Sequence, residues 1–181
     1  MAEIFIILGL ILLNGLFSMA EIALVSARKA RLEAQAHKGD ARAKEALKLA
    51  NHPDNFFSTV QIGITLIGIL TGIYSGEKLK SGLISWLQQF ESVRDYSNGI
   101  ATAIIVIIIT YFSLVLGELV PKRLGLSRPE AIAKLVAGAM RIVSFITYPF
   151  IWLLTNSTSL IVTVLTIRTR DNAVTAEEIK A

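Results

Sequence analysis

The chain has 181 residues, of which 53% are hydrophobic and 18% are charged, and its mean hydropathy is +0.59. Soluble domains carry about a quarter charged residues, so this composition argues against a soluble enzyme. The lack of cysteine excludes disulfide frameworks, thiolate metal sites and cysteine nucleophiles. The formal net charge of +4 could suggest nucleic-acid binding, but basic residues in a membrane protein usually mark its cytoplasmic flanks. We therefore expect neither a nucleic-acid partner nor an enzymatic activity.

Three apolar stretches are each long enough to cross a bilayer, which takes roughly 20 residues. They cover residues 2–26, 56–74 and 99–120. Positive charges follow the first stretch and do not precede it, which argues against a secretory signal peptide. By the positive-inside rule this order also places the N terminus outside the cell. The sequence therefore predicts an all-α membrane protein with three transmembrane helices.

Residues 27–50 alternate alanine and leucine with charged side chains. This pattern predicts one amphipathic juxtamembrane helix on the cytoplasmic surface, where basic side chains meet the head groups of membrane lipids. Residues 131–167 are apolar, but Lys134, Arg141 and Pro149 interrupt them, and basic residues flank both ends. We predict a re-entrant or interfacial helix pair bent at Pro149, with a cytoplasmic C terminus. A fourth span, which would leave the C terminus outside, is the alternative.

The polar end of the chain carries Thr175-Ala176-Glu177-Glu178, which has the spacing of a capping box at a helix start. We expect residues 1–170 to form one transmembrane domain. Residues 171–181 would then begin a linker to a cytoplasmic domain of a longer protein.

Polar residues within the spans recur at helical spacing, so that each span carries a polar stripe: Asn14, Ser18 and Glu21; Gln61, Thr65, Gly68 and Gly72; and Thr110, Ser113 and Gly117, with Glu118 beside them. Ionisable groups within a membrane usually face the protein interior and mark functional sites. Carboxylate, hydroxyl and amide oxygens suit hard cations such as Mg²⁺. The stripes therefore predict a polar cluster that could bind such a cation.

Two structural alternatives remain open at this stage. Gly68 and Gly72 could serve helix packing alone, as small residues four apart often do. Glu21 could form an ion pair with Arg28 or Lys29 near the membrane surface. Glu118 is less easily explained in this way, because Pro121 follows it closely and frees backbone carbonyls at membrane depth.

Three segments resemble the signatures of one family: Asn14-Gly15-Leu16-Phe17-Ser18-Met19-Ala20-Glu21-Ile22-Ala23-Leu24-Val25-Ser26, Gln61-Ile62-Gly63-Ile64-Thr65-Leu66 and Gly117-Glu118-Leu119-Val120-Pro121-Lys122. They are similar to the transmembrane domain of the CorC/CNNM (cyclin M) magnesium and cobalt efflux proteins, often labelled hemolysin-related in bacteria. The resemblance implies a homodimer in a bacterial inner membrane, with an inward-facing acidic cavity. It also implies cytoplasmic CBS-pair domains, often binding ATP, beyond this chain.

In that family serine hydroxyls, backbone carbonyls and the glutamate of the third signature hold Mg²⁺. The resemblance carries this role first to Ser18 and Glu118, and then to Gly117, Ser26, Gly63 and Thr65. The expected cavity-lining residues are Asn14, Glu21, Gln61 and Ser113. Several magnesium-linked relatives have asparagine near the positions of Ile64 and Gly68, where this chain has none.

We therefore expect a transporter domain that exports Mg²⁺ or Co²⁺ from the cytoplasm, with Lys122, Arg123 and the 27–50 helix anchoring its cytoplasmic face. The version of the second signature in this chain resembles a bacterial branch that includes a proposed polyamine exporter, so export of putrescine or cadaverine is one alternative. A non-transporting membrane anchor or regulator for CBS domains is another.

Overall fold

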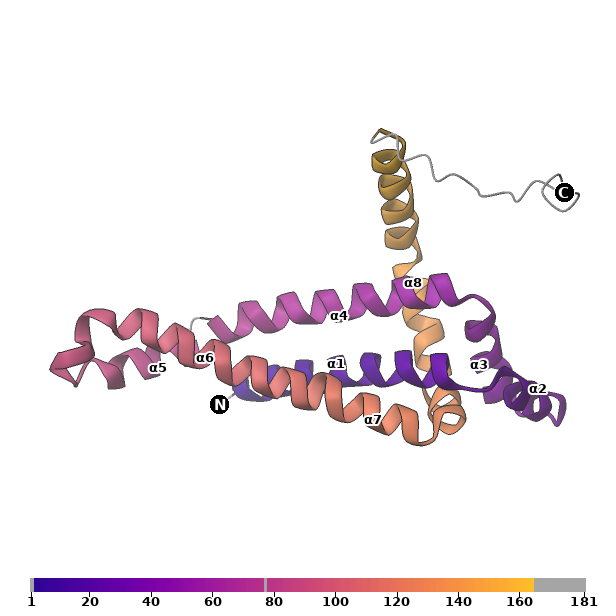
Figure 1. The fold of residues 1–181 in the computed structure, drawn as a ribbon, viewed down its shortest axis with the longest axis horizontal. Helices are drawn as coiled ribbons and strands as arrows, with labels where there is room; N and C mark the ends of the chain where they lie inside the picture. The colour runs from indigo at the N-terminus through magenta and orange to yellow at the C-terminus, as the bar shows by residue number, and fades with distance from the viewer. Residues whose placement is uncertain (1, 77, 165–181) are drawn as a thin grey trace, which may run out of the picture. The chain divides into compact units, whose positions relative to one another are not determined.

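The computed structural model describes residues 2–76 and 78–164, and all the regular elements in these ranges are helices (Figure 1). The predicted all-α membrane architecture is confirmed. The chain divides into two compact units, residues 1–147 and 148–181. The homodimer remains a prediction.

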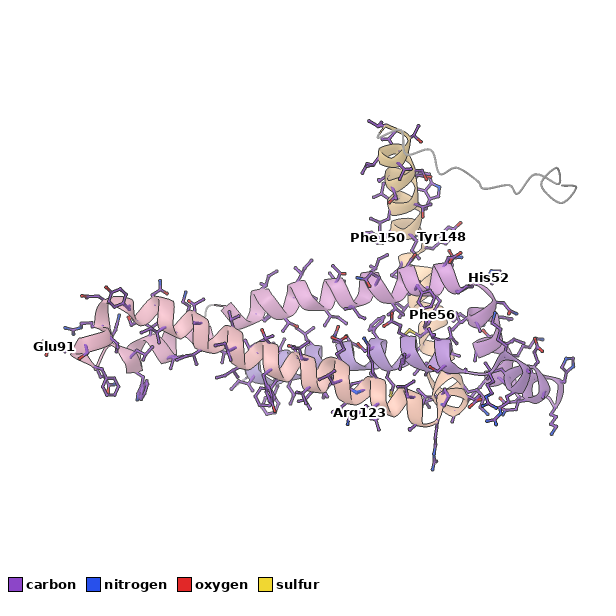
Figure 2. All side chains as sticks on the ribbon, in the orientation of Figure 1. His52, Phe56, Glu91, Arg123, Tyr148 and Phe150 are labelled. Atoms are coloured by element: carbon purple, nitrogen blue, oxygen red, sulfur yellow. The ribbon has the colours of Figure 1, made fainter. Side chains whose placement is uncertain are left out.

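The three predicted spans coincide with α1 (Ala2–Ser26), α4 (Pro53–Gly76) and α6 (Ser97–Leu114). Helix α6 does not end near residue 120 but continues through a π-helical turn, η2 (Val115–Leu119), into α7 (Val120–Ser127). Between α4 and α6 lie α5 (Lys78–Leu87) and the 3₁₀-helix η1 (Glu91–Tyr96). Glu91, before α6, and His52, before α4, lie at opposite ends of the first unit (Figure 2).

The predicted helix over residues 27–50 is wrong in one respect, because the structure has two helices there, α2 (Lys29–His37) and α3 (Ala41–Asn51). Gly39 separates them with a φ of 92°, a left-handed conformation that side chains other than glycine adopt with difficulty. One oxygen of Asp40 then accepts hydrogen bonds from the backbone N–H groups of Arg42 and Ala43, at 3.0 and 3.1 Å. A glycine followed by a capping aspartate ends one helix and starts the next.

The helix pair predicted for residues 131–167 is also wrong in the described part, where a single helix, α8 (Pro129–Val164), includes Pro149. A proline inside a helix removes one N–H donor, and the residues around it contain no glycine or asparagine within five positions that would end the helix. Residues 165–167 and the predicted linker at 171–181 lie outside the described residues.

By length and composition, four helical stretches of the described part could cross a membrane: α1, α4, the α6–η2–α7 stretch and α8. Helix α8 is long enough to form the fourth span that was the alternative for residues 131–167. The chain is therefore a multi-pass membrane protein by composition and fold.

In the first unit, α1 packs against both α4 and the η2–α7 stretch (Figure 1). Its core is an apolar cluster that includes Phe17, Leu24, Leu32 and Ala133 together with Phe56, which is labelled in Figure 2 and only 1% exposed. Burying a large apolar side chain is worth about 1.5–3 kcal/mol. This cluster fixes α1 in position relative to α4.

Ion pairs join the α2–α3 hairpin to the part of α8 that belongs to the first unit. The N···O distances are 3.5 Å for Arg31–Glu130, 2.9 Å for Lys134–Asp40 and 3.2 Å for Arg141–Glu45. The hydrogen bond from the Lys134 ammonium holds the pKa of the Asp40 carboxyl below its ordinary value. Asp40 thus caps α3 with one oxygen and binds α8 with the other.

The described part of the second unit is the C-terminal portion of α8, residues 148–164. Its large apolar side chains are mostly exposed, including Phe150, Trp152 and Leu153. Phe150 and Tyr148 are labelled in Figure 2. Such a surface is suited to contact with lipid.

Candidate functional site

The polar face of α1 is turned toward the protein interior. Ser18 is only 2% exposed, and Asn14 and Glu21, one turn away in either direction, are partly buried. The described residues provide no ion pair for Glu21, so the alternative pairing with Arg28 or Lys29 is not formed. The predicted stripe on α1 therefore supplies an amide, a hydroxyl and a carboxylate to the interior.

Opposite Asn14 lies the π-helical turn η2, which contains Gly117 and Glu118. In this turn the N–H of Val120 donates to the carbonyl of Val115, five residues back, whereas an α-helix would use a carbonyl four residues back. Single π turns inside α-helices are rare and are frequent at functional sites.

Pro121 explains why a side chain of α1 is needed at this turn. The Gly117 carbonyl would ordinarily accept from the N–H of residue 121, but proline has none. Asn14 takes over this role, since its Nδ2 donates to the Gly117 oxygen at 3.1 Å. The signature residues Asn14, Gly117 and Pro121 are thus parts of one interaction.

Gly15 allows α1 to approach the turn closely. A Cβ atom on Gly15 would lie 2.8 Å from Cγ of Pro121 and 2.9 Å from the Leu116 carbonyl oxygen. On the other side of the contact, a Cβ atom on Gly117 would lie 3.3 Å from both the Asn14 amide nitrogen and the Ile11 carbonyl oxygen. The glycines of the first and third signatures therefore allow α1 and η2 to approach each other closely.

One oxygen at this contact has no partner. Asn14 Oδ1 is buried and accepts no hydrogen bond from the described part of the chain. Leaving a buried polar atom unpaired is costly, about 1–3 kcal/mol, and such an atom calls for a ligand or a water. The oxygen is therefore available to a group that binds in the protein interior.

A cavity of about 310 Å³ adjoins this contact, between α1, α4 and α6. Its polar lining consists of side chains from all three helices and two glycines of α4: Asn14, Thr71, Thr110, Ser113, Gly68 and Gly72. A Cβ atom on Gly68 or Gly72 would meet no atom within 4 Å, so these glycines do not form a tight helix contact within this chain. They widen the cavity instead.

Glu118 and Lys122 form an ion pair one helical turn apart, with 2.6 Å between Lys122 Nζ and Glu118 Oε1. Both side chains are partly exposed, 41% for Glu118 and 36% for Lys122. An incoming cation would therefore compete with an ammonium group already held by the carboxylate. The sequence places Lys122 in the third signature, but its pairing with Glu118 became evident only from the structure.

The structure brings only some of the predicted site residues together. Asn14, Gly117 and Ser113 meet at the turn or line the cavity. Gly63 is buried under the ring of Phe17. The other two predicted site residues of the second signature, Gln61 and Thr65, are exposed on α4, and Ser26 lines a different cavity.

Thr71 was not among the predicted site residues, although it is 7% exposed and lines the cavity. Its hydroxyl donates to the Ile67 carbonyl of its own helix at 2.8 Å and keeps lone pairs for another donor or a cation. Thr71 lies three residues after Gly68, so the helical spacing places it on the same face of α4 as the predicted polar stripe. This spacing could have identified it as a cavity residue.

The described residues contain no group of three or more His, Cys, Asp or Glu side chains that could hold a metal ion. Near η2, a bound cation would therefore depend largely on amide, hydroxyl and carbonyl oxygens together with the Glu118 carboxylate. This donor set suits hard cations or ammonium groups.

Comparison with known proteins gives consistent matches. Residues 5–181 match the family model for the cyclin M transmembrane N-terminal domain. The chain is 48% identical over 179 residues to a UPF0053 protein of Synechocystis, covering 98% of this chain and 40% of that protein. It is 32% identical over 176 residues to the polyamine export protein of Haemophilus influenzae, covering 97% of this chain and 40% of that protein. For the polyamine export protein of Escherichia coli the identity is 28% over 180 residues, with 99% and 40% covered. The chain thus spans about 40% of the length of these relatives.

Proposed function

The chain belongs to the family of cyclin M transmembrane domains, as its three signatures predicted, and on this premise we propose that it exports a small cation through the site between α1 and η2. Mg²⁺ is the first candidate substrate, with Co²⁺ as a related one. The proposal includes the predicted orientation, with the N terminus outside and the C terminus in the cytoplasm, and assembly as a homodimer. ATP binding belongs to the CBS domains expected elsewhere in the protein.

The observation that carries the proposal is the unpaired, buried oxygen of Asn14 beside the π-helical turn. A cation placed there would meet this oxygen, the carbonyl oxygens of the turn and the hydroxyl of Ser18 one turn along α1. Glu118 would supply the single negative charge of the site. Oxygen ligands of this kind are those that Mg²⁺ prefers.

The ion pair between Lys122 and Glu118 gives the carboxylate a counterion within the same helix. The ammonium nitrogen of Lys122 lies 2.6 Å from the Glu118 carboxylate. On cation binding Lys122 would move away, which is inexpensive because the pair is partly exposed and worth at most about 1 kcal/mol. The cavity lined by Ser113, Thr71 and Thr110 would provide polar contacts along the path.

A second candidate is export of a polyamine, a chain with primary ammonium groups. Two observations favour it: relatives of this chain are named polyamine export proteins, and Glu118 already accepts a primary ammonium, that of Lys122. An alkyl diamine would place its ammonium where the lysine now lies and its methylene groups in the apolar part of the cavity.

Binding to the purified chain in lipid nanodiscs tests the proposal. We expect Mg²⁺ to raise the unfolding temperature of the wild type, and Glu118→Gln to weaken this response roughly tenfold or more in Mg²⁺ concentration, because a charged ligand is lost. Glu91→Gln, which removes an exposed carboxylate at the opposite end of the first unit, is the matched control. An equal response of Glu118→Gln and wild type would refute the role of Glu118.

Competition distinguishes the two substrates. If putrescine displaces Mg²⁺ and binds more tightly, the polyamine assignment replaces the magnesium one. If the folded protein binds neither, and proteoliposomes of the full-length protein show no flux of either, the remaining alternative is the membrane anchor or regulator for CBS domains.

A further inference from the structure

A second cavity of the first unit, about 590 Å³ in volume, lies where α1 and α7 end and where α2 and α8 begin. Its lining includes Ser26, Arg28, Arg31, Ser127, Arg128 and Lys134. Of the three family signatures only the last residue of the first, Ser26, contributes to it, and the transport proposal does not use this cavity.

The cavity is strongly basic. Four cationic side chains line it, against one acidic side chain, Glu130. Arg31 is paired with that glutamate at 3.5 Å, and Lys134 is paired with Asp40 at 2.9 Å. Arg28 and Arg128 have no acidic partner among residues 2–76 and 78–164.

Two unpaired guanidinium groups around one cavity repel each other, and in surroundings less polar than water this repulsion grows. An anion bound between them would convert the repulsion into two charge-assisted contacts. Arginine is especially suited to this because its planar fork matches the oxygens of a phosphate group.

The position of the cavity indicates where such an anion would come from. Ser26 and Ser127 are the last residues of two stretches, 4–26 and 91–127, that are long and apolar enough to cross a membrane. Because α1 and α7 pack together, both stretches end at the same level. On this ground we place the cavity at the membrane surface, at the depth of the lipid head groups.

A buried amide oxygen of Gln35 indicates which further group a ligand of this cavity would carry. Gln35 lines the same cavity, and its Oε1 atom is buried and lacks a hydrogen-bond donor in the described part of the chain. A ligand that suits the whole cavity would present anionic oxygens to the arginines and a hydroxyl group to Gln35. A phosphate with a neighbouring glycerol hydroxyl has both features.

We infer that this cavity is a binding site for a phosphoglycerol group, with Arg28 and Arg128 holding the phosphate. The membrane-surface position favours the head group of an anionic phospholipid such as phosphatidylglycerol as the source. A soluble glycerol phosphate would offer the same chemistry from the aqueous side.

Native mass spectrometry of the purified chain, titrated in detergent with phosphatidylglycerol or phosphatidylcholine, tests this inference. We expect the wild type to prefer phosphatidylglycerol, and the double variant Arg28→Gln/Arg128→Gln to bind it at least tenfold more weakly, since two charge-assisted contacts are lost. The matched control is Arg42→Gln/Lys44→Gln, which removes two exposed charges from the neighbouring α3 outside the cavity. Its affinity should stay within about twofold, the change expected for a charge at the rim of a site.

Each other result has a definite meaning. Equal weakening in both double variants would overturn the inference, because it would indicate a diffuse basic surface, and so would a wild type that does not distinguish the two lipids. Binding of glycerol 3-phosphate that requires the same arginines would support the site and identify a soluble source. If the double variant does not fold, the single variants Arg28→Gln and Arg128→Gln replace it. Each should weaken binding at least threefold, and unchanged binding in both would overturn the inference.

Discussion

The interaction between Asn14 and the π-helical turn can be tested by a double-mutant cycle. Asn14→Ala removes the donor to the Gly117 carbonyl, and the usual α-helical donor, the N–H of residue 121, is missing because that residue is proline. In a Pro121→Ala background residue 121 regains an N–H group, four residues after Gly117, which is the donor position of a regular α-helix. The same loss of Asn14 should then matter much less.

The magnitude follows from the hydrogen bonds involved. In the wild type, Asn14→Ala leaves a buried carbonyl unsatisfied, which costs about 1–3 kcal/mol. In the Pro121→Ala background the helix itself can satisfy the carbonyl, so the cost should fall to about 1 kcal/mol or less. The unpaired Oδ1 of Asn14 is removed in both backgrounds, and its effect cancels in the cycle. We therefore expect a coupling free energy of about 1–2 kcal/mol, well above the roughly 0.5 kcal/mol that separates independent sites.

The free energy of unfolding can be measured by titrating the purified chain in mild detergent with sodium dodecyl sulfate and following helicity by circular dichroism. Asn98→Ala, which truncates an exposed asparagine in the first turn of α6, controls for the loss of an amide and should change stability by less than about 0.5 kcal/mol. Additive costs of Asn14→Ala and Pro121→Ala would refute the reasoning, because the carbonyl would then not depend on both residues.

Three further predictions concern the same unit. Gly15→Ala should destabilise the chain by about 1–3 kcal/mol through overpacking against the turn, whereas Gly68→Ala, whose added methyl group meets no atom within 4 Å, should not, as unfolding titrations of both will show. Lys122→Gln should tighten cation binding up to about fivefold by freeing the neighbouring carboxylate, and unchanged affinity in the nanodisc assay would argue against competition. Asp40 has a lowered pKa, so the ionised form adds stability above its ordinary pKa of 3.8 that is lost as the pH falls below that value. Melting curves of wild type and Asp40→Asn should therefore converge at acidic pH.

Much of this architecture could be predicted from the sequence because it depends on local patterns. The apolar runs define α1, α4 and α6, and the spacing of Asn14, Ser18 and Glu21 places them on one face of α1, as the structure has them. Gly39 followed by Asp40 was a readable signal for the break between α2 and α3. The helix-forming composition on both sides of this pair nevertheless favours one continuous helix, so the prediction was wrong there.

Other features depend on contacts between distant residues. A proline after Gly117 indicates a disturbed helix, but not whether the disturbance is a stop, a kink or a π turn. The outcome depends on Asn14, which lies 103 residues away and supplies the missing donor. Similarly, Gln61 and Thr65 belong to a segment that resembles the second family signature, yet both are exposed in the single chain. Their exposure depends on how α4 packs against the other helices, which the sequence pattern does not give.

The π turn has a mechanical consequence for α7. Returning η2 to regular α-helix would advance every later residue by one position, which turns α7 by about 100° about its axis and shifts it by about 1.5 Å. Pro121 cannot form the hydrogen bond that such a ratchet step requires, and the close contact of Gly125 with the Met19 carbonyl resists the rotation. The rotation of α7 about its axis relative to α6 is therefore fixed. An export cycle of the proposed kind would therefore have to move α6, η2 and α7 as one piece.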